Sequence, residues 1–183
     1  MVNIAVMGSI NMDLIITLER LPATGETLLG NRTMYAQGGK GANQAVAAAR
    51  LGASPVLIGK IGDDAFGAQI RRGLEVEGID ITFLGVATGT TTGVAVIMLV
   101  RGENTIVVAR GANDTVTPED VQRAHAAIAR SGAVLCQLEV PLAAVEAALA
   151  AGRAAGVITV LDPAPAQRCP DTVIALADYI TPN

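Results

Sequence analysis

Short aliphatic runs alternate with helical patterns along most of the 183 residues, and this alternation limits the possible folds more than any other feature. The aliphatic runs are nearly continuous rather than alternating with polar residues, as is typical of parallel strands that are covered on both faces. The sequence therefore predicts an α/β fold with a mostly parallel central sheet. The predicted strands are 2–7, 55–60, 81–86, 132–136, 157–161 and 177–180.

The alternation is interrupted by a β-hairpin pattern, in which 91–100 and 105–108 are β-type runs joined by 101–104. Both faces of the first arm are apolar, so both need a cover. They carry Ala95, Ile97 and Leu99 on one side and Val94, Val96 and Met98 on the other. We predict a small β-sheet lid, made of 14–36 and 88–110, beside an α/β core made of 1–13, 37–87 and 111–183.

Two helices have recognisable first residues. Asp63 is the predicted N-cap of a helix whose apolar face carries Phe66, Ile70 and Leu74. A metal pair formed by Asp63 and Asp64 is the less favoured alternative. Thr117 followed by Pro118 predicts a second helix start. His125 lies on that helix without a neighbouring acid or cysteine, and we assign it no chemistry.

A glycine-rich loop at 37–44 precedes an alanine-rich helix at 42–51. Its glycines allow a sharp turn and a close approach of the backbone to a ligand, and the helix adds free N–H groups. Lys40 and Asn43 are three residues apart, so both can point into one small volume. The loop is not a Walker P-loop, because Gly41 stands where that motif has Ser or Thr.

Further polar side chains follow the ends of predicted strands. Asn11 and Asp13 project to one side if their segment is extended. Glu139 follows the carboxyl end of 132–136, where open α/β sheets bind ligands. The alternative for Asn11 and Asp13 is that they are turn residues at a strand end. The alternative for Glu139 is a surface charge. A site with this mixture of donors and acceptors suits a hydroxyl-rich ligand such as a sugar.

The overall composition excludes several classes of function. A net charge of −4 and a pI near 4.9 argue against a nucleic-acid partner. The sequence lacks a signal peptide pattern and an apolar run of about 20 residues, so we expect no membrane association. Cys136 and Cys169 have no CxxC spacing and suit a reducing cytoplasm. The first turn, 8–11, lacks the glycine fingerprint of dinucleotide-dependent oxidoreductases.

Several segments, in order along the chain, closely resemble the ribokinase-like carbohydrate kinases. These segments are Gly8-Ser9-Ile10-Asn11-Met12-Asp13, Pro22-Ala23-Thr24-Gly25-Glu26-Thr27, Gly38-Gly39-Lys40-Gly41-Ala42-Asn43-Gln44-Ala45, Gly62-Asp63-Asp64-Ala65-Phe66-Gly67, Gly111-Ala112-Asn113, Gln137-Leu138-Glu139 and Asp162-Pro163-Ala164-Pro165-Ala166. The resemblance covers essentially the whole chain. It implies a Rossmann-like three-layer α/β/α sandwich with a β-sheet lid.

The resemblance also implies an activity and its ligands. The expected reaction transfers the γ-phosphate of ATP to the 5-hydroxyl of D-ribose, with Mg²⁺, and lids of two subunits clasp each other in a homodimer. Asn183 matches the first residue of the family's Asn-x-x-Glu stretch near phosphate and Mg²⁺. The implied sugar ligands are Asn11, Asp13, Gly39, Lys40, Asn43 and Glu139, with lid contacts from Ala95 and Ile97.

The chain departs from the family pattern at its end. The family's catalytic base lies in a Gly-Ala-Gly-Asp segment, which 111–114 does not match, so we expect the base beyond Asn183 and assign no catalytic or metal-binding residue. The adenine site and the monovalent-cation (K⁺) site are expected in the same absent part. The sheet is therefore predicted to be incomplete on its C-terminal side, and this chain alone to be inactive. A related kinase for another sugar or nucleoside and a truncated, non-catalytic sugar-binding protein remain alternatives.

Overall fold

The structure, a computed structural model, describes residues 2–182 and contains two sheets. The larger sheet has six strands in the order β10-β9-β8-β1-β4-β5, and every pairing in it is parallel. This confirms the predicted α/β architecture. The strands are β1 (Asn3–Met7), β4 (Ser54–Gly62), β5 (Leu84–Ala87), β8 (Ala133–Gln137), β9 (Ile158–Asp162) and β10 (Tyr179–Ile180).

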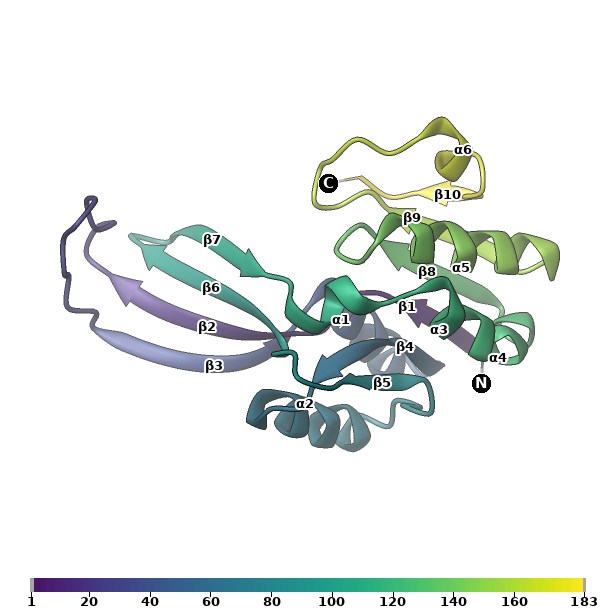
Figure 1. Cartoon of the computed structure of the whole chain (residues 1–183), viewed down its shortest axis with the longest axis horizontal. Helices are drawn as coiled ribbons and strands as arrows, with labels where there is room; N and C mark the ends of the chain where they lie inside the picture. Colours follow the sequence, from purple (N-terminus) through teal and green to yellow (C-terminus); the bar gives the residue numbers. More distant parts are fainter. Residues whose placement is uncertain (1, 183) are drawn as a thin grey trace.

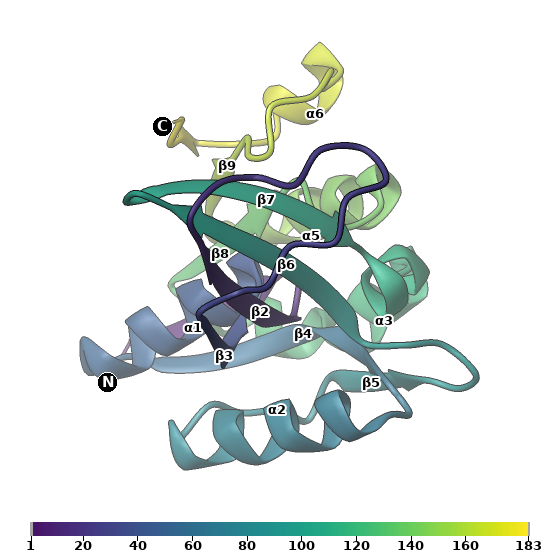
Figure 2. The same ribbon diagram turned by 90° about the vertical axis from the view of Figure 1, so that its left-hand side faces the viewer.

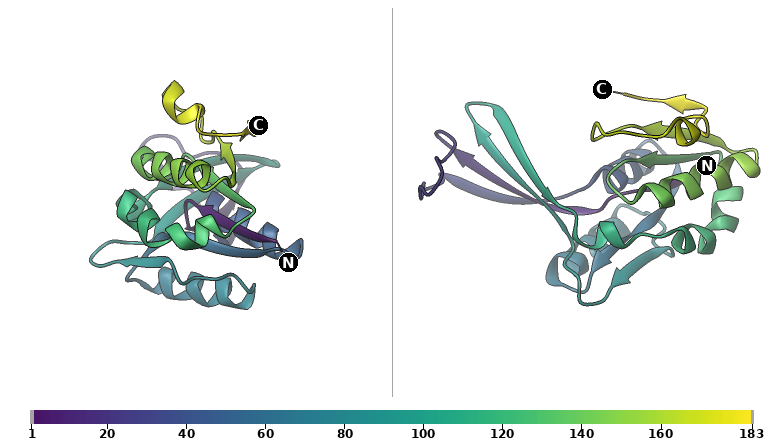
Figure 3. Two further views of the ribbon diagram at one scale, coloured as in Figure 1. Left: turned by 90° about the vertical axis from the view of Figure 1, so that its right-hand side faces the viewer. Right: turned by 45° about the horizontal axis from the view of Figure 1, so that its top comes forward.

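Helices pack on both faces of this sheet and form two apolar cores. Alternate residues of β1 enter opposite cores, Val6 on one side and Ala5 and Met7 on the other. One core includes residues of α1 (Lys40–Arg50) and α2 (Ala65–Val76). The other includes residues of α3 (Pro118–Arg123), α4 (His125–Ala129) and α5 (Leu142–Ala154). Figure 3 shows α3, α4 and α5 together on one side of the sheet.

Two elements in or near the larger sheet differ from the sequence-based expectation. β5 begins at Leu84 rather than at residue 81, because Thr82 makes two hydrogen bonds to the Asp80 carboxylate in a turn. A short helix, α6 (Asp171–Ile174), was not predicted. Strand β10 forms one edge of the sheet, above β9 in Figure 1. No helix within residues 2–182 is long and apolar enough to cross a bilayer.

The second sheet contains β3 (Arg32–Gly38), β2 (Asn11–Leu18), β6 (Gly93–Val100) and β7 (Glu103–Ala109), in that order. It extends away from the α/β body (Figure 1), and Figure 2 views it from its free end. We call it the projecting sheet. β2 and β6 pair in parallel, whereas the two outer pairings are antiparallel. The turn between β6 and β7 is shorter than predicted: only Arg101 and Gly102 form it, both with positive φ, as in two-residue hairpin turns.

Apolar side chains on the outer strands of the projecting sheet are exposed. Tyr35 on β3 and Val107 on β7 are each 59% exposed. Met34, Ile106 and Val108 are exposed as well. The Tyr35 ring lies 6.3 Å from the ring of Phe66 on α2, so one contact ties this sheet to the body.

Two acidic side chains that follow β4, Asp63 and Asp64, hold the segment that leads into β6. The N-cap of α2 is Asp64 rather than the predicted Asp63: its carboxylate accepts a hydrogen bond from Gly67 N at 2.8 Å. The Asp64 carboxylate also accepts hydrogen bonds from the backbone N–H and the hydroxyl of Thr92. Asp63 instead accepts one from Gly89 N at 2.9 Å, because its side chain points toward the loop before β6. Both acids therefore bind backbone, which argues against the metal pair.

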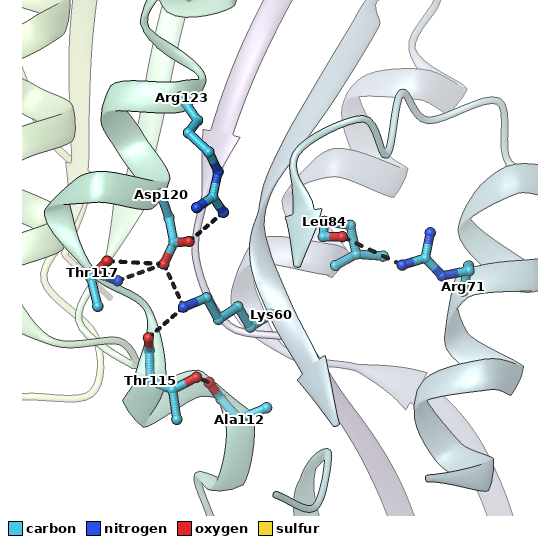
Figure 4. Close-up of polar contacts among 8 residues, drawn as sticks. All are labelled: Lys60, Arg71, Leu84, Ala112, Thr115, Thr117, Asp120 and Arg123. Carbon is cyan, nitrogen blue, oxygen red and sulfur yellow. Dashed lines mark hydrogen bonds and ion pairs between the residues drawn. The ribbon is translucent and has the colours of Figure 1, made fainter. Parts of the chain in front are cut away.

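A buried ion pair joins β4 to α3 (Figure 4). Lys60 Nζ lies 2.8 Å from Asp120 Oδ2 and donates a hydrogen bond to Thr115 O at 2.7 Å. Asp120 is the third residue of α3 and accepts a hydrogen bond from Thr117 N, which confirms Thr117 as the helix start. The Asp120 side chain is 4% exposed and that of Lys60 is 18% exposed. The Asp120 carboxylate thus links the start of α3 to β4, and Lys60 links β4 to η1.

Candidate functional site

Polar side chains gather where β1 and β8 end, in front of α1. Ser9 Oγ donates a hydrogen bond to Glu139 Oε2 at 2.5 Å and accepts one from Lys40 N at 2.9 Å. Lys40 Nζ lies 3.9 Å from Glu139 Oε1. The structure therefore brings Lys40 and Glu139 together and places Ser9 between them. Ser9 was not predicted as a site residue, although it continues the i, i+2 alternation of Asn11 and Asp13.

Glycines allow the loop before α1 to lie against the end of β1. Gly39 has φ of +91°, and a Cβ at this position would lie 2.6 Å from Ser9 O and 2.7 Å from Asn11 N. A Cβ on Gly41 would lie 2.6 Å from the carbonyl carbon of Gly8. These neighbours are backbone atoms, so they cannot rotate away. The close approach explains why the glycine-rich loop needs glycine here.

Asp13 lies on β2 beside this cluster and is half-buried. Its partners in register are Ala36 on β3 and Ala95 on β6. Burial, and to a lesser extent the charge of Glu139, raise the pKa of Asp13 above its ordinary value. Asp13 and Glu139 are thus close enough for their charges to repel each other. A ligand that donates hydrogen bonds to both carboxylates would relieve this repulsion.

We expect Asp13→Asn to raise the melting temperature of the free chain while it weakens ligand binding. A raised pKa means that the folded state disfavours the charged carboxylate, so the stability cost is present at neutral pH. This cost disappears as the pH falls through the raised pKa, and the two proteins should then converge. Thermal denaturation between pH 4 and pH 8 measures the difference. Asp114→Asn, at an exposed surface pair, is the control; a lower melting temperature for Asp13→Asn at pH 8 would contradict the expectation.

Asn11 is buried at the start of β2, and its carboxamide contacts Asn113 in the 3₁₀ turn η1 (Gly111–Thr115). Asn113 Nδ2 donates a hydrogen bond to Asn11 Oδ1 at 2.8 Å. Asn113 was part of a family-like segment but had no predicted role. The contact could not be predicted from the sequence, because about one hundred residues separate Asn113 from Asn11 and no local pattern indicates it.

The remaining predicted residues fall in two places. Ala95 and Ile97 lie beside Asp13 and Ile15 in register, so Ala95 shares the face of Asp13. Asn43 is exposed on the first turn of α1 and lines a hollow with Gln37 and Arg72. Among residues 2–182, no hydrogen bond joins the Asn43 side chain to Asp13 or Glu139. Asn183 lies outside the described residues.

Gln137 fixes the end of β8 against α1. The side chain is fully buried, and its Nε2 donates a hydrogen bond to Gln44 Oε1 at 2.6 Å. Gln137 Oε1 approaches Gly8 so closely that a Cβ there would lie 1.8 Å away. A Cβ at position 8 would therefore displace the Gln137 side chain, which holds the strand that leads to Glu139.

Metal-binding side chains are scattered rather than clustered in the part of the chain that the structure describes. Within residues 2–182, no group of three or more His, Cys, Asp and Glu side chains is close enough to hold a metal ion. Both cysteines are free, and burial raises the pKa of the Cys136 thiol to about 12.

Comparison with known proteins identifies the family. The model described as "pfkB family carbohydrate kinase" matches residues 1–183. The chain belongs to the pfkB family of carbohydrate kinases. This membership agrees with the resemblance carried by the glycine-rich loop and the strand-end acids.

Relatives of this pfkB-family chain include enzymes for two sugars. It is 42% identical to the ribokinase of Bacillus subtilis (strain 168) over 181 residues, 99% of this chain and 62% of that protein. It is 39% identical to the deoxyribokinase of Salmonella typhi over 183 residues, 99% of this chain and 60% of that protein. The chain thus spans about three fifths of the length of these relatives.

A solved structure gives the same result for the fold. The structure of Arabidopsis thaliana ribokinase complexed with ribose and ATP matches with a TM-score of 0.88 and 31% sequence identity. The match covers 99% of this chain and 60% of that chain. The fold of this pfkB-family chain is therefore that of the corresponding part of a ribokinase.

Proposed function

We propose that this chain supplies the sugar-binding part of an ATP-dependent ribokinase. The observation that carries the proposal is the cluster of Lys40 and Glu139, bridged by Ser9, beside Asp13 at the carboxyl ends of β1 and β8. Ligands of open α/β sheets bind at this edge. The ribokinase relatives, and the structural match to a ribokinase that holds ribose and ATP, support ribose as the sugar.

The chemistry of the cluster fits a polyol. Ionised Asp13 and Glu139 only accept hydrogen bonds, so they bind hydroxyl hydrogens, whereas Lys40 donates to hydroxyl oxygens. Asn11 and the backbone of Gly39 add further polar groups beside them. The face of β6 that carries Ala95 and Ile97 would cover the apolar side of a sugar ring. Asn43 belongs to the proposed ligands if its side chain turns toward this cluster when a sugar binds.

The transfer step needs groups that we place beyond Asn183. Phosphoryl transfer depends on positioning and on stabilising charge on the moving phosphoryl group. The sites for ATP, Mg²⁺ and K⁺ would belong to the part beyond Asn183. Asn183 itself would lie near the phosphate. We therefore propose that the chain alone binds ribose without turnover, and that the catalytic base lies in a longer gene product.

We also propose that two copies associate through the projecting sheet. On the face opposite Asp13, its outer strands expose Tyr35 and Val107, which a second sheet would cover. Ribokinase relatives and two free cysteines support a cytoplasmic location. Sedimentation of the wild-type chain and of a Val107→Lys variant would test the association. A wild-type chain that is monomeric at all concentrations would contradict it.

Calorimetric titration of the chain with ribose tests the proposed site. We expect Glu139→Gln and Lys40→Met each to weaken ribose binding by about 10- to 100-fold, the usual worth of one hydrogen bond to a charged group. Glu146→Gln, on the exposed face of α5, is the matched control and should bind like the wild type. Unchanged affinity in Glu139→Gln would place the sugar elsewhere.

The second candidate is a kinase of the same family for another sugar or a nucleoside. The deoxyribokinase relative at 39% identity favours 2-deoxyribose over unrelated sugars. Titration with ribose, 2-deoxyribose and fructose distinguishes the candidates by the relative affinities of the chain for the three sugars. A coupled ATPase assay on the chain with each sugar addresses catalysis: clear turnover would contradict the placement of the base beyond Asn183.

A further inference from the structure

We infer that Asn113 is a positioning residue that fixes the orientation of the Asn11 carboxamide, so that Asn11 offers its NH₂ group to a sugar hydroxyl oxygen. The inference rests on the proposed function, because that function makes Asn11 a sugar ligand. It adds a residue from η1 to the site and specifies which hydrogen-bonding role Asn11 plays.

The orientation of Asn113 is determined by backbone atoms. Its Oδ1 accepts a hydrogen bond from Ile10 N at 2.9 Å, and its Nδ2 donates one to Ile10 O at 3.1 Å. A backbone N–H can only donate and a carbonyl can only accept, so the reversed amide would place like groups against each other at both contacts. Asn113 therefore has one allowed orientation.

The orientation of Asn11 follows from that of Asn113. Nδ2 of Asn113 also donates to Asn11 Oδ1 at 2.8 Å, so the oxygen of Asn11 must face Asn113. Asn11 Nδ2 donates no hydrogen bond to any residue between 2 and 182. The NH₂ group is thus the end of Asn11 that remains for a ligand.

The contact is too compact for the amide to rotate freely. Asn11 is 3% exposed and Asn113 is 1% exposed. A Cβ on Gly93, the register partner of Asn11 on β6, would lie 2.2 Å from Asn11 Oδ1 and 2.3 Å from Asn113 Nδ2. Glycine at 93 lets the two amides meet beneath the strand, and loss of this contact would remove the donor to the buried Asn11 Oδ1.

The consequence is a matched pair of roles along β2. Asn11 donates and ionised Asp13, two residues further on the same side of the strand, accepts. A hydroxyl placed between them can accept from Asn11 and donate to Asp13 at the same time. Removal of that hydroxyl would leave both side chains without a ligand partner, which gives the site its preference for a hydroxyl at this position.

A double-mutant cycle tests the inference in the 183-residue chain. Asn113→Asp keeps an oxygen for Ile10 N but replaces the donor to Asn11 with an acceptor, and Asn11→Ala removes the carboxamide. Ribose and a set of analogues that each lack one hydroxyl are titrated by calorimetry. We expect each single variant to bind ribose about tenfold more weakly and to lose discrimination at the same one hydroxyl. The double variant should be no weaker than Asn11→Ala.

Controls separate the inference from the proposed function. Asp114→Asn, next to Asn113 and exposed, should behave like the wild type. If Asn11→Ala loses the discrimination while folded Asn113→Asp retains it, the inference is wrong and the sugar site stands. If the wild type discriminates against no analogue, the proposed site is wrong. The scalar coupling across the hydrogen bond from Asn113 Nδ2, measured by NMR in the free chain, is an independent check: its absence would overturn the inference whatever the sugar does.

Discussion

Replacement of Asp120 by alanine is expected to lower the free energy of unfolding by about 3–5 kcal/mol. The Asp120 side chain is 4% exposed, and its removal would leave the Lys60 ammonium partly buried beside Thr115 O without its counter-charge. The first turn of α3 would also lose the acceptor for Thr117 N. Urea denaturation, followed by circular dichroism, measures the change.

Arg123→Ala is the matched control for this prediction. Arg123 pairs with the same carboxylate at 2.6 Å, but its side chain is 62% exposed, so its loss should cost less than about 1 kcal/mol. Similar costs for the two variants would show that the surface pair, not the buried one, holds the network.

The same network gives a pH dependence. Burial acts to raise the pKa of Asp120, but hydrogen bonds from Lys60 and Thr117 outweigh it and hold the pKa below its ordinary value. A lowered carboxyl pKa stabilises the fold above the unfolded-state pKa, and this contribution is lost as the pH falls through the folded-state pKa. The stability difference between wild type and Asp120→Ala should therefore shrink in acid.

Gly39→Ala is expected to destabilise the chain by several kcal/mol and to abolish ribose binding. The substitution combines a sparsely populated backbone conformation, φ 91° and ψ 137°, which costs about 1–3 kcal/mol, with contacts of 2.6 and 2.7 Å to backbone atoms of Ser9 and Asn11. Because neither atom can move alone, the loop must leave the end of β1. Lys40 would then lose its place beside Glu139. Denaturation and calorimetric titration report the two effects separately.

Gly52→Ala isolates the backbone strain. Gly52 has φ of +86°, close to that of Gly39, but a Cβ there would meet nothing within 4 Å. This variant should lose only about 1–2 kcal/mol and bind ribose normally. Equal losses in the two variants would mean that the close approach to β1 contributes nothing.

Much of the fold could be predicted because it depends on local patterns. Continuous aliphatic runs gave the strands of the central sheet, and Thr117 with Pro118 gave the start of α3. The errors lie where tertiary contacts decide a detail. Asp64 rather than Asp63 caps α2 because Thr92, on a distant segment, fixes the Asp64 carboxylate. Helix α6 has only four residues, too few for a periodic pattern.

The site was predictable only as a set of residue types. Lys40 lies in the glycine-rich loop and Glu139 follows a strand of the central sheet, and their distance of 3.9 Å comes from the structure alone. The bridging hydroxyl of Ser9 and the amide of Asn113 could not be deduced, because their partners are far away in the sequence. Polar contacts of this kind have no spacing rule.

The parallel pairing of β2 with β6 determines the order in which the chain can fold. Asn11 pairs with Gly93, so the whole of α1, β4, α2 and β5 must be synthesised before this pairing can form. Loop closure over such a separation is slow, so β2 and β3 should wait as a two-stranded pair until β6 is available. Until then β2 has an unpaired apolar edge that includes Leu14, Ile15 and Ile16, which makes the half-synthesised chain the form most prone to aggregate.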